Sequence, residues 1–158
     1  MADIYAEIRA DHDIHRKLLE TIADTSGDSA ERRKAWDAFF HEVKSHAAAE
    51  EETFYSKLIS KTWGQDAARH SVAEHKELDE LMEELHAMDM SHGSWLQKFE
   101  RLRHDYLHHI DEEEKDLFAR AKKVIPDSEI HGFGARFRTR KAEESALVER
   151  KRKHQLED

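Results

Sequence analysis

The chain lacks cysteine entirely and has few residues that interrupt helices. Its 158 residues include no Cys, one Pro and five Gly. Without thiols it forms neither a disulfide scaffold nor a thiolate metal site, so any bound metal must be held by His, Asp or Glu. Because helix breakers are scarce and long runs are rich in Ala, Leu, Glu, Lys and Arg, the sequence predicts an all-α protein.

The chain also lacks long apolar runs and an excess of positive charge. No window approaches about eighteen consecutive apolar residues, and the N-terminal stretch MADIYAEIRADHD has neither the basic nor the apolar region of a signal peptide. We therefore expect a cytoplasmic protein with no membrane partner. A formal net charge of -9 argues against nucleic acid as the main partner, since phosphate binding needs a concentrated positive surface. Nothing in the sequence specifies a protein partner or a homo-oligomer.

Gly, Pro and capping residues divide the chain into five expected helices. We expect an antiparallel up-down-up-down four-helix bundle over residues 1–125, followed by an accessory C-terminal helix and tail over 126–158 that pack on the bundle or trail from it. Asp28 and Glu31 form a capping-box pattern before the second helix, and Pro126 ends the fourth. The basic residues near the C-terminus alternate with acidic ones, which is typical of a solvated helix. The expected ranges of the first four helices are about 3–24, 28–60, 66–89 and 94–125.

The two halves of the chain resemble each other after a shift of 63 positions. We interpret each half as one helical hairpin that the sequence uses twice. Thirteen His are present, which is unusual for this length, and several of them follow the repeat. The shift superposes His12 on His75, His46 on His109, Glu50 on Glu113, Asp11 on Glu74, Glu51 on Glu114 and Tyr55 on Phe118.

Helical spacing places one imidazole in the middle of the apolar face of each of the first four helices: His12, His46, His75 and His109. Glu50 and Glu113 each follow one of these His by one turn. Unpartnered buried polar groups cost roughly 1–3 kcal/mol each, and an unpaired carboxylate costs more. Two metal ions bridged by the two carboxylates, with two His each, would satisfy all six groups and leave coordination positions open. Such donors suit redox-active iron, and they are also compatible with Mn or Zn.

Each of these residues also has a purely structural interpretation. A single His on an apolar face is more often a hydrogen-bonded core residue, but the repeat and the paired Glu favour a metal centre for the whole set. His15, one turn after His12, is either an additional ligand or a core residue. Asp11 and Glu74 flank the ligand face, either as acceptors for the imidazoles or as solvated charges. The residues expected at the surface are His41, His104, Glu51 and Glu114, about 140° from the ligand face, together with His70, His86, His92, His108, His131 and His154.

Four segments of the sequence resemble the hemerythrin-like, or HHE cation-binding, family over roughly residues 1–145: DHDIHRKLLETI, HAAAEEETFYSKL, EHKELDELMEEL and HIDEEEKDLF. The resemblance implies a four-helix bundle with a non-heme di-iron centre, oxo- or hydroxo-bridged, that binds or reacts with O2, peroxide or nitric oxide. It also implies which residues hold the two Fe ions. His12 and His46 would ligate one iron, His75 and His109 the other, and Glu50 and Glu113 would bridge them.

The sequence departs from the oxygen-carrying members of that family at Ser71. Those members have a second His four residues before the position of His75, where this chain has Ser71. The remaining pattern of four His and two Glu is similar to the bacterial branch associated with nitrosative stress and iron-sulfur repair. We therefore expect reaction with peroxide, nitric oxide or O2 rather than simple oxygen transport, with catalysis left open.

Two other functional classes were weighed against this interpretation. A redox or iron sensor, or an interaction module that uses the metal centre as a switch, fits the same residues. A ferritin-like di-iron oxidase needs two Glu-x-x-His motifs on different helices, and only Glu83 with His86 has that spacing within a helix core. The ferritin-like alternative is therefore disfavoured.

Overall fold

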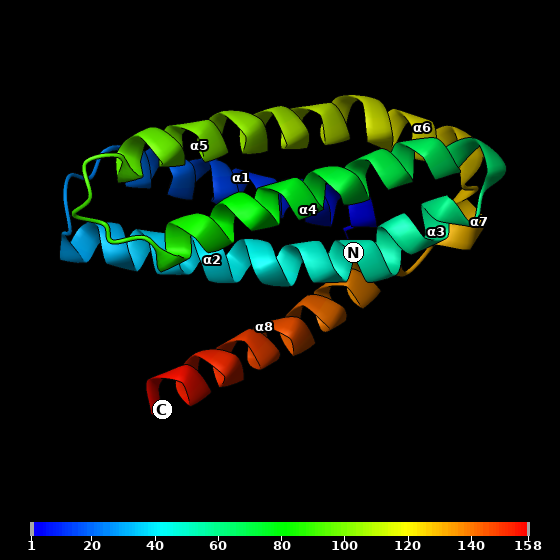
Figure 1. Ribbon diagram of the computed structural model, residues 1–158. Coiled ribbons are helices and arrows are strands. Elements are labelled where there is room, and N and C mark those ends of the chain that lie inside the picture. The colour runs from blue at the N-terminus through cyan, green and yellow to red at the C-terminus, as the bar shows by residue number, and fades with distance from the viewer. Residues whose placement is uncertain (1, 158) are drawn as a thin grey trace.

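The computed structural model describes the backbone of residues 2–157 and the side chains of residues 2–150, and this part of the chain is helical with no strand. Four long helices run alternately up and down beside one another, and this confirms the expected bundle (Figure 1). The helices of the bundle are α1 (Ile4–Ala23), α2 (Ala30–Glu50), η1 (Glu51–Tyr55), α3 (Ser56–Ile59), η2 (Thr62–Gly64), α4 (Gln65–Ala87), α5 (Trp95–Glu112), η3 (Glu113–Leu117) and α6 (Phe118–Val124).

The start of α2 differs by one residue from the sequence prediction. Ser29 is the N-cap, and its side chain accepts a hydrogen bond from the backbone N–H of Arg32 at 3.1 Å. The expected capping box of Asp28 with Glu31 is therefore wrong. Asp28 instead forms an ion pair with Arg33. Both residues are good N-caps, so the sequence alone did not distinguish them.

Two of the long helices continue through a wider, π-helical turn. In η1 the backbone N–H of Ser56 bonds to the carbonyl oxygen of Glu51, and in η3 that of Phe118 bonds to the carbonyl oxygen of Glu113. Both bonds span five residues instead of four. Such turns are uncommon in helices and occur often at functional sites. They begin within one position of each other in the repeat, one directly after Glu50 and the other at its equivalent Glu113.

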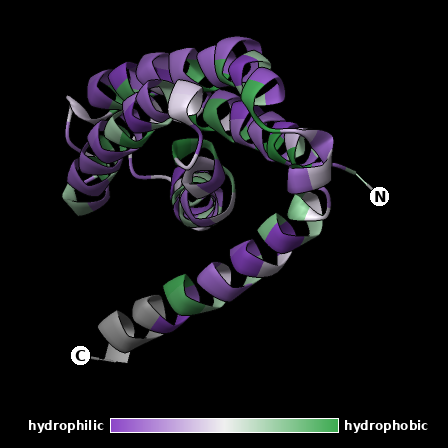
Figure 2. Ribbon diagram, turned by 90° about the vertical axis from the view of Figure 1, so that its right-hand side faces the viewer, coloured by the Kyte–Doolittle hydropathy of each residue, from purple (hydrophilic) through white to green (hydrophobic). Residues whose placement is uncertain are grey.

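The apolar core is divided into two clusters by a layer of polar side chains. One cluster includes Tyr5, Phe54 and Phe118, and the other includes Trp36 and Trp95. Apolar residues turn inward and polar residues outward along the helices (Figure 2). Because the aromatic side chains on both sides exclude water, the polar groups between the clusters must find partners within the protein.

The expected accessory C-terminal helix is present and is preceded by one short helix, so this segment contains two helices. They are α7 (Asp127–Ile130) and α8 (Phe133–Glu157), and Gly132 joins them with a left-handed φ of 82°. This conformation is open to Gly and costly for other residues. The helix α8 crosses the bundle obliquely (Figure 1) and packs against α1 and α2, where Phe137 is fully buried.

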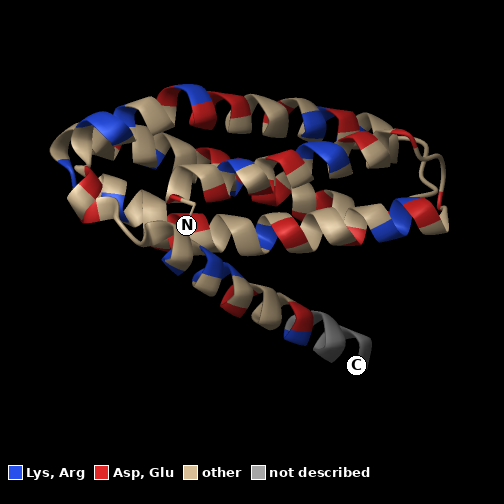
Figure 3. Cartoon of the chain, turned by 180° about the vertical axis from the view of Figure 1, so that it is seen from behind, with Lys and Arg blue, Asp and Glu red and all other residues tan. Residues whose placement is uncertain are grey.

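Because α8 covers part of α2, one expected surface residue is not free at the surface. His41 is half-buried, and its Nε2 lies 2.6 Å from the hydroxyl of Ser145 on α8. Its repeat equivalent His104 is exposed as expected. Basic residues at the start of α8 are followed by acidic ones (Figure 3), so the described part of the helix carries both signs of charge. His154 and the end of the basic run at 149–153 lie outside the side chains that the structure describes.

A helix needs about 20 predominantly apolar residues to cross a bilayer. Within residues 2–157, no helix combines the length and the apolar character needed to cross a bilayer.

Candidate metal centre

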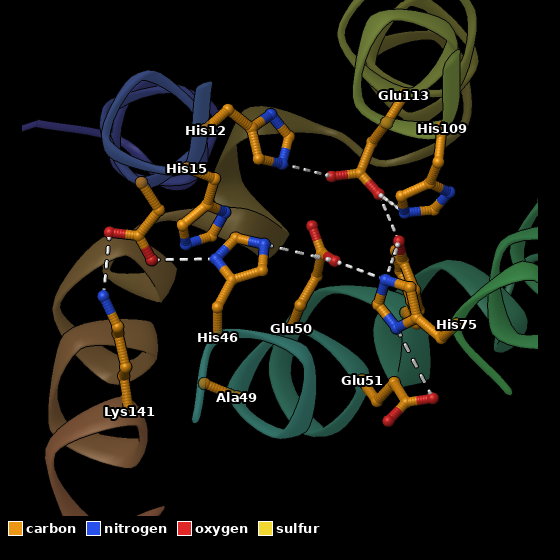
Figure 4. A network of polar contacts seen from close by, with 12 residues as sticks. His12, His15, His46, Ala49, Glu50, Glu51, His75, His109, Glu113 and Lys141 are labelled. Carbon is orange, nitrogen blue, oxygen red and sulfur yellow. Dashed lines mark hydrogen bonds and ion pairs between the residues drawn. The ribbon is translucent and has the colours of Figure 1, made fainter. Parts of the chain in front are cut away.

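The structure brings all six expected ligands together in the polar layer between the two apolar clusters (Figure 4). They form two groups of four, and within each group one potential ligand atom per residue lies within 4.8 Å of the others. The two carboxylates belong to both groups. The first group is His12, His46, Glu50 and Glu113, and the second is His75, His109, Glu50 and Glu113.

The imidazoles point their Nε2 atoms at the two shared carboxylates. The Oε1 atom of Glu50 lies 3.5 Å from Nε2 of His46 and 3.1 Å from Nε2 of His75. Glu113 makes the matching contacts with the other two imidazoles, at 3.3 Å and 3.6 Å. Each carboxylate therefore contacts one imidazole from each group. Both carboxylates thus lie between the two pairs of imidazoles.

The Nδ1 atoms of the same imidazoles point outward, each toward another carboxylate. Metal-binding His are commonly oriented in this way, because an acceptor at the second nitrogen fixes the tautomer and the ring. Asp11 and Glu74 thus act as acceptors, one of the two roles considered from the sequence. Three of the contacts are hydrogen bonds and the fourth is a longer ion pair: His12 with Glu114 at 2.7 Å, His46 with Asp11 at 2.8 Å, His109 with Glu74 at 2.9 Å and His75 with Glu51 at 3.7 Å.

The expectation that Glu51 and Glu114 are simply surface residues is therefore wrong. The helical angle placed them away from the ligand face of their own helices, and that angle takes no account of a neighbouring helix. The side chain of Glu114 lies beside α1 and is only 20 % exposed, where it meets both His12 and Arg16. The signal that could have identified them was the repeat, which superposes Glu51 on Glu114.

Several buried polar atoms of the centre have no hydrogen-bond partner among the described residues. They are Nε2 of His12, both carboxylate oxygens of Glu50 and Oε1 of Glu113. Buried polar groups are normally paired, and an unpaired one costs free energy. Nitrogen and carboxylate donors facing a common point fit a transition-metal ion, which would partner all of these atoms.

In the metal-free protein, several of these groups bind protons where the metal ions would lie. Burial lowers the pKa of His12, but its contacts with the carboxylates of Glu113 and Glu114 outweigh burial and raise the pKa to about 9. For the same reason the pKa of His75 rises to about 10, through contacts with Glu50 and Glu51. Burial and the adjacent carboxylate of Glu50 raise the pKa of Glu113. The metal-free centre is therefore a proton-rich cluster, and metal binding must release protons.

The structure does not bring His15 into either group of ligands. Its Nδ1 lies 2.7 Å from the hydroxyl of Tyr106, and its Nε2 lies 3.2 Å from Oε2 of Glu42. Both ring nitrogens are thus engaged, although the ring packs 5.0 Å from that of His46. Burial lowers the pKa of His15 to about 4, so the imidazole is neutral near pH 7.

One residue of the centre was missed at the sequence level. The hydroxyl of Tyr55 donates a hydrogen bond to Glu113 and lies 3.3 Å from Nε2 of His75. On a regular α-helix Tyr55 would face away from the direction of Glu50. In the π-helical turn η1, residues five apart come round to a similar side, so Tyr55 points into the centre.

A cavity of about 320 Å³ reaches the centre from the side of α2 and α4. Exposed Lys76 and half-buried Lys44 lie at its outer part, and all four ligand imidazoles line its inner part. The size is at the lower end of small-molecule sites and is ample for a diatomic molecule or peroxide. Its apolar lining consists of Val43, Ala47, Ala48, Val72, Leu78, Met82 and Ile110.

The fold and the site together define a helical-bundle protein with a buried site for metal cations. The chain matches the model of the Hemerythrin HHE cation binding domain over residues 3–121, and it therefore belongs to that family.

Two known proteins are similar to the chain. A crystal structure titled as a Hemerythrin HHE cation binding domain-containing protein, the Rv2633c homolog from Mycobacterium kansasii, superposes with a TM-score of 0.85 at 21% identity, over 96% of this chain and 92% of that one. A DNA nickase of Nostoc sp. (strain PCC 7120 / SAG 25.82 / UTEX 2576) is 24% identical over 135 residues, which are 85% of this chain and 38% of the nickase. The chain thus spans well under half the length of this relative.

Proposed function

We propose that the six clustered residues hold two iron ions and that the centre reacts with O2, peroxide or nitric oxide. One observation carries the proposal: four imidazole Nε2 atoms and two carboxylates meet in a buried layer in which several of these atoms have no other partner. Iron held in this way would supply electrons and open coordination positions for a small ligand. His12 and His46 would hold one ion, and His75 and His109 the other, with Glu50 and Glu113 shared.

The surrounding residues support small-ligand chemistry at this centre. The cavity between α2 and α4 offers a route for a small molecule, and its apolar walls limit the entry of bulk water. Each ion would have four protein donors, fewer than the six that iron commonly accepts. Among the described side chains no additional His joins either group, so both ions would keep open positions. This favours reaction at the centre over simple reversible carriage.

A sensor or interaction module is the second candidate function. The similarity to the DNA nickase favours this role, because the match covers only 38% of that longer protein. In such a role, metal occupancy would change the stability of the bundle and so the surface it offers to a partner.

The test is metal analysis and absorption spectroscopy of the purified protein, before and after dithionite and after addition of peroxide or nitric oxide. We expect about two Fe per chain and ferric absorption bands that dithionite removes. Catalytic loss of peroxide would establish an enzyme, and a spectral response without turnover would favour the sensor. Colourless protein that contains Zn, or no metal, would overturn the iron assignment.

Substitutions test the assignment of the ligands. His46→Ala with His109→Ala removes one imidazole from each group and should abolish both the bands and the bound metal. His104→Ala is the matched control, because its side chain is 84% exposed on the same helix as His109. Retention of both ions by the double variant would refute the proposed ligand set.

A further inference from the structure

The two ends of the centre differ in the charges that surround their outer carboxylates. At the His12–His46 end, Oδ1 of Asp11 lies 2.8 Å from Nη2 of Arg138 and 3.0 Å from Nζ of Lys141. Both cations come from α8. The other oxygen of Asp11 accepts the hydrogen bond from His46. This carboxylate is therefore held between one imidazole and two cations, and it is fully buried.

The second outer carboxylate of the same end is also paired with cations. Oε2 of Glu114, which accepts the hydrogen bond from His12, lies 2.7 Å from Nη2 of Arg16. Its Oε1 lies 3.8 Å from Nε of Arg9. Both outer carboxylates at this end thus have Lys or Arg partners, two from α8 and two from α1.

At the His75–His109 end, no described Lys or Arg side chain pairs with the outer carboxylates. Glu74 contacts His109 and, at 3.6 Å, the exposed imidazole of His70. Glu51 contacts His75. Neither carboxylate lies within ion-pair distance of a described Lys or Arg. Although the repeat relates the two ends, their surroundings differ in charge.

Lys141 also begins a second series of contacts on the His12–His46 side of the centre. Its Nζ lies 3.0 Å and 2.9 Å from the two carboxylate oxygens of Glu42, which in turn contacts His15. His15 accepts a hydrogen bond from Tyr106, which lines the cavity. One lysine, itself 9% exposed, therefore contacts both Asp11, the acceptor for His46, and Glu42, which contacts His15.

We propose that Arg138 and Lys141 are positioning residues of the metal centre, and that they make the ion held by His12 and His46 the more easily reduced of the two. This inference rests on the proposed di-iron centre. A carboxylate at Nδ1 strengthens an imidazole as a donor and so favours the more highly charged ferric ion. A cation on that carboxylate opposes this effect. The added electron is therefore more favourable at the His12–His46 end, because Lys and Arg side chains there offset the negative charges of Asp11 and Glu114.

The test is a stepwise reductive titration with dithionite of protein that contains iron-57, followed by Mössbauer and electron paramagnetic resonance spectroscopy. The one-electron reduced wild-type protein should show one ferrous and one ferric environment. In Lys141→Met the first reduction step should move to lower potential, because Asp11 loses a cation. The ferric-to-ferrous ratio at fixed potential should rise about tenfold, which is about 59 mV for one electron. The second step should move less.

Two variants control for effects on the fold. Arg140→Met removes a cation of α8 that pairs only with Glu52, Glu143 and Glu144, and it should leave both steps unchanged. Lys141→Arg keeps the charge and should restore the wild-type potential. Circular dichroism verifies the helical content of each variant. If Lys141→Met does not fold, Lys141→Gln retains a donor without the charge and provides the same comparison.

The outcomes separate this inference from the proposed function. Wild-type protein without iron would contradict the proposed function itself. Wild-type protein with two irons, together with equal shifts of both steps in Lys141→Met or shifts no larger than those in Arg140→Met, would overturn only the role of α8. A larger shift of the first step, restored by Lys141→Arg, would support it.

Discussion

The hydroxyl of Tyr55, on the first hairpin, donates a hydrogen bond to Glu113, on the second. It also lies 3.3 Å from Nε2 of His75, so the phenol oxygen stands among the donors of the His75–His109 group. The repeat places Phe118, which has no hydroxyl, at the equivalent position of the other half. The phenol is therefore a second feature that distinguishes the two ends of the centre.

We predict that Tyr55→Phe keeps the metal and changes the spectrum. Phe is accommodated at the equivalent position, so the bundle should fold. The loss of one hydrogen bond to a buried carboxylate should destabilise the metal-free protein by about 1–3 kcal/mol. Because the phenol oxygen is removed from the His75–His109 group, the visible absorption of the ferric protein should change while metal analysis still finds two ions.

Tyr5→Phe provides the control for this substitution. The hydroxyl of Tyr5 is buried and has no hydrogen-bond partner among the described residues. Its removal should leave the spectrum as in the wild-type protein. A Tyr55→Phe spectrum that also matches the wild type would show that the phenol does not take part in the centre.

The repeat explains why the six clustered residues could be found from the sequence. Apolar spacing placed His12 and His46 on the inward faces of their helices, and the shift of 63 positions identified His75 and His109 as their equivalents. The up-down bundle then required these faces to meet. Each inference depended on side chains of a single regular helix, for which spacing along the chain is a sufficient guide.

The parts that the sequence did not predict depend on contacts between elements. Tyr55 faces the centre only because η1 is a π-helical turn, and no residue pattern in EETFY distinguishes such a turn from a regular one. Glu114 was assigned to the surface because α1 could not be placed beside it. Arg138 and Lys141 lie in a segment with alternating charges that is typical of a solvated helix, and their partners are more than ninety positions away in the chain.

A second prediction concerns Asp11, the acceptor for His46. Asp11→Asn keeps the shape of the side chain and removes its charge, so the imidazole of His46 loses its ionic partner, and Arg138 and Lys141 each lose one of their two carboxylate partners. Loss of such a partner typically weakens metal binding about 10- to 100-fold. We expect a loss within this range in a competition titration against a chelator, with the helical content retained.

Asp13→Asn serves as the matched control for that experiment. Asp13 lies on the same helix, but its side chain is 75% exposed and pairs with Arg16 at the surface. Exposed ion pairs contribute little, about 0–1 kcal/mol. Equal metal affinities of the Asp11 and Asp13 variants would contradict the role given to Asp11.

A third prediction follows from the protonated state of the metal-free centre. The pKa of His12 is raised to about 9 and that of His75 to about 10, above the value of 6.5 for a free imidazole. The folded protein therefore holds these protons more tightly than the unfolded chain. Their stabilising contribution is complete below about pH 6.5 and is lost as the pH rises through 9 to 10.

Urea unfolding of the metal-free protein at several pH values measures this effect. We expect the free energy of unfolding to fall by a few kcal/mol between pH 6.5 and pH 10. Metal-loaded protein should not show this fall, because its imidazoles are already deprotonated and bound. The same stability of the metal-free protein at both ends of this range would mean that the buried cluster does not hold the extra protons.

The last prediction concerns the route by which a small ligand reaches the centre. Ala47 lines the cavity between α2 and α4 and lies next to the ligand His46 in the chain. A larger side chain there should fill part of the cavity. Ala47→Leu should therefore bind two ions as the wild type does and react several-fold more slowly with peroxide or nitric oxide in stopped-flow measurements. Ala38→Leu, an exposed position on the same helix, should react at the wild-type rate, and an unchanged rate in Ala47→Leu would indicate that ligands enter by another path.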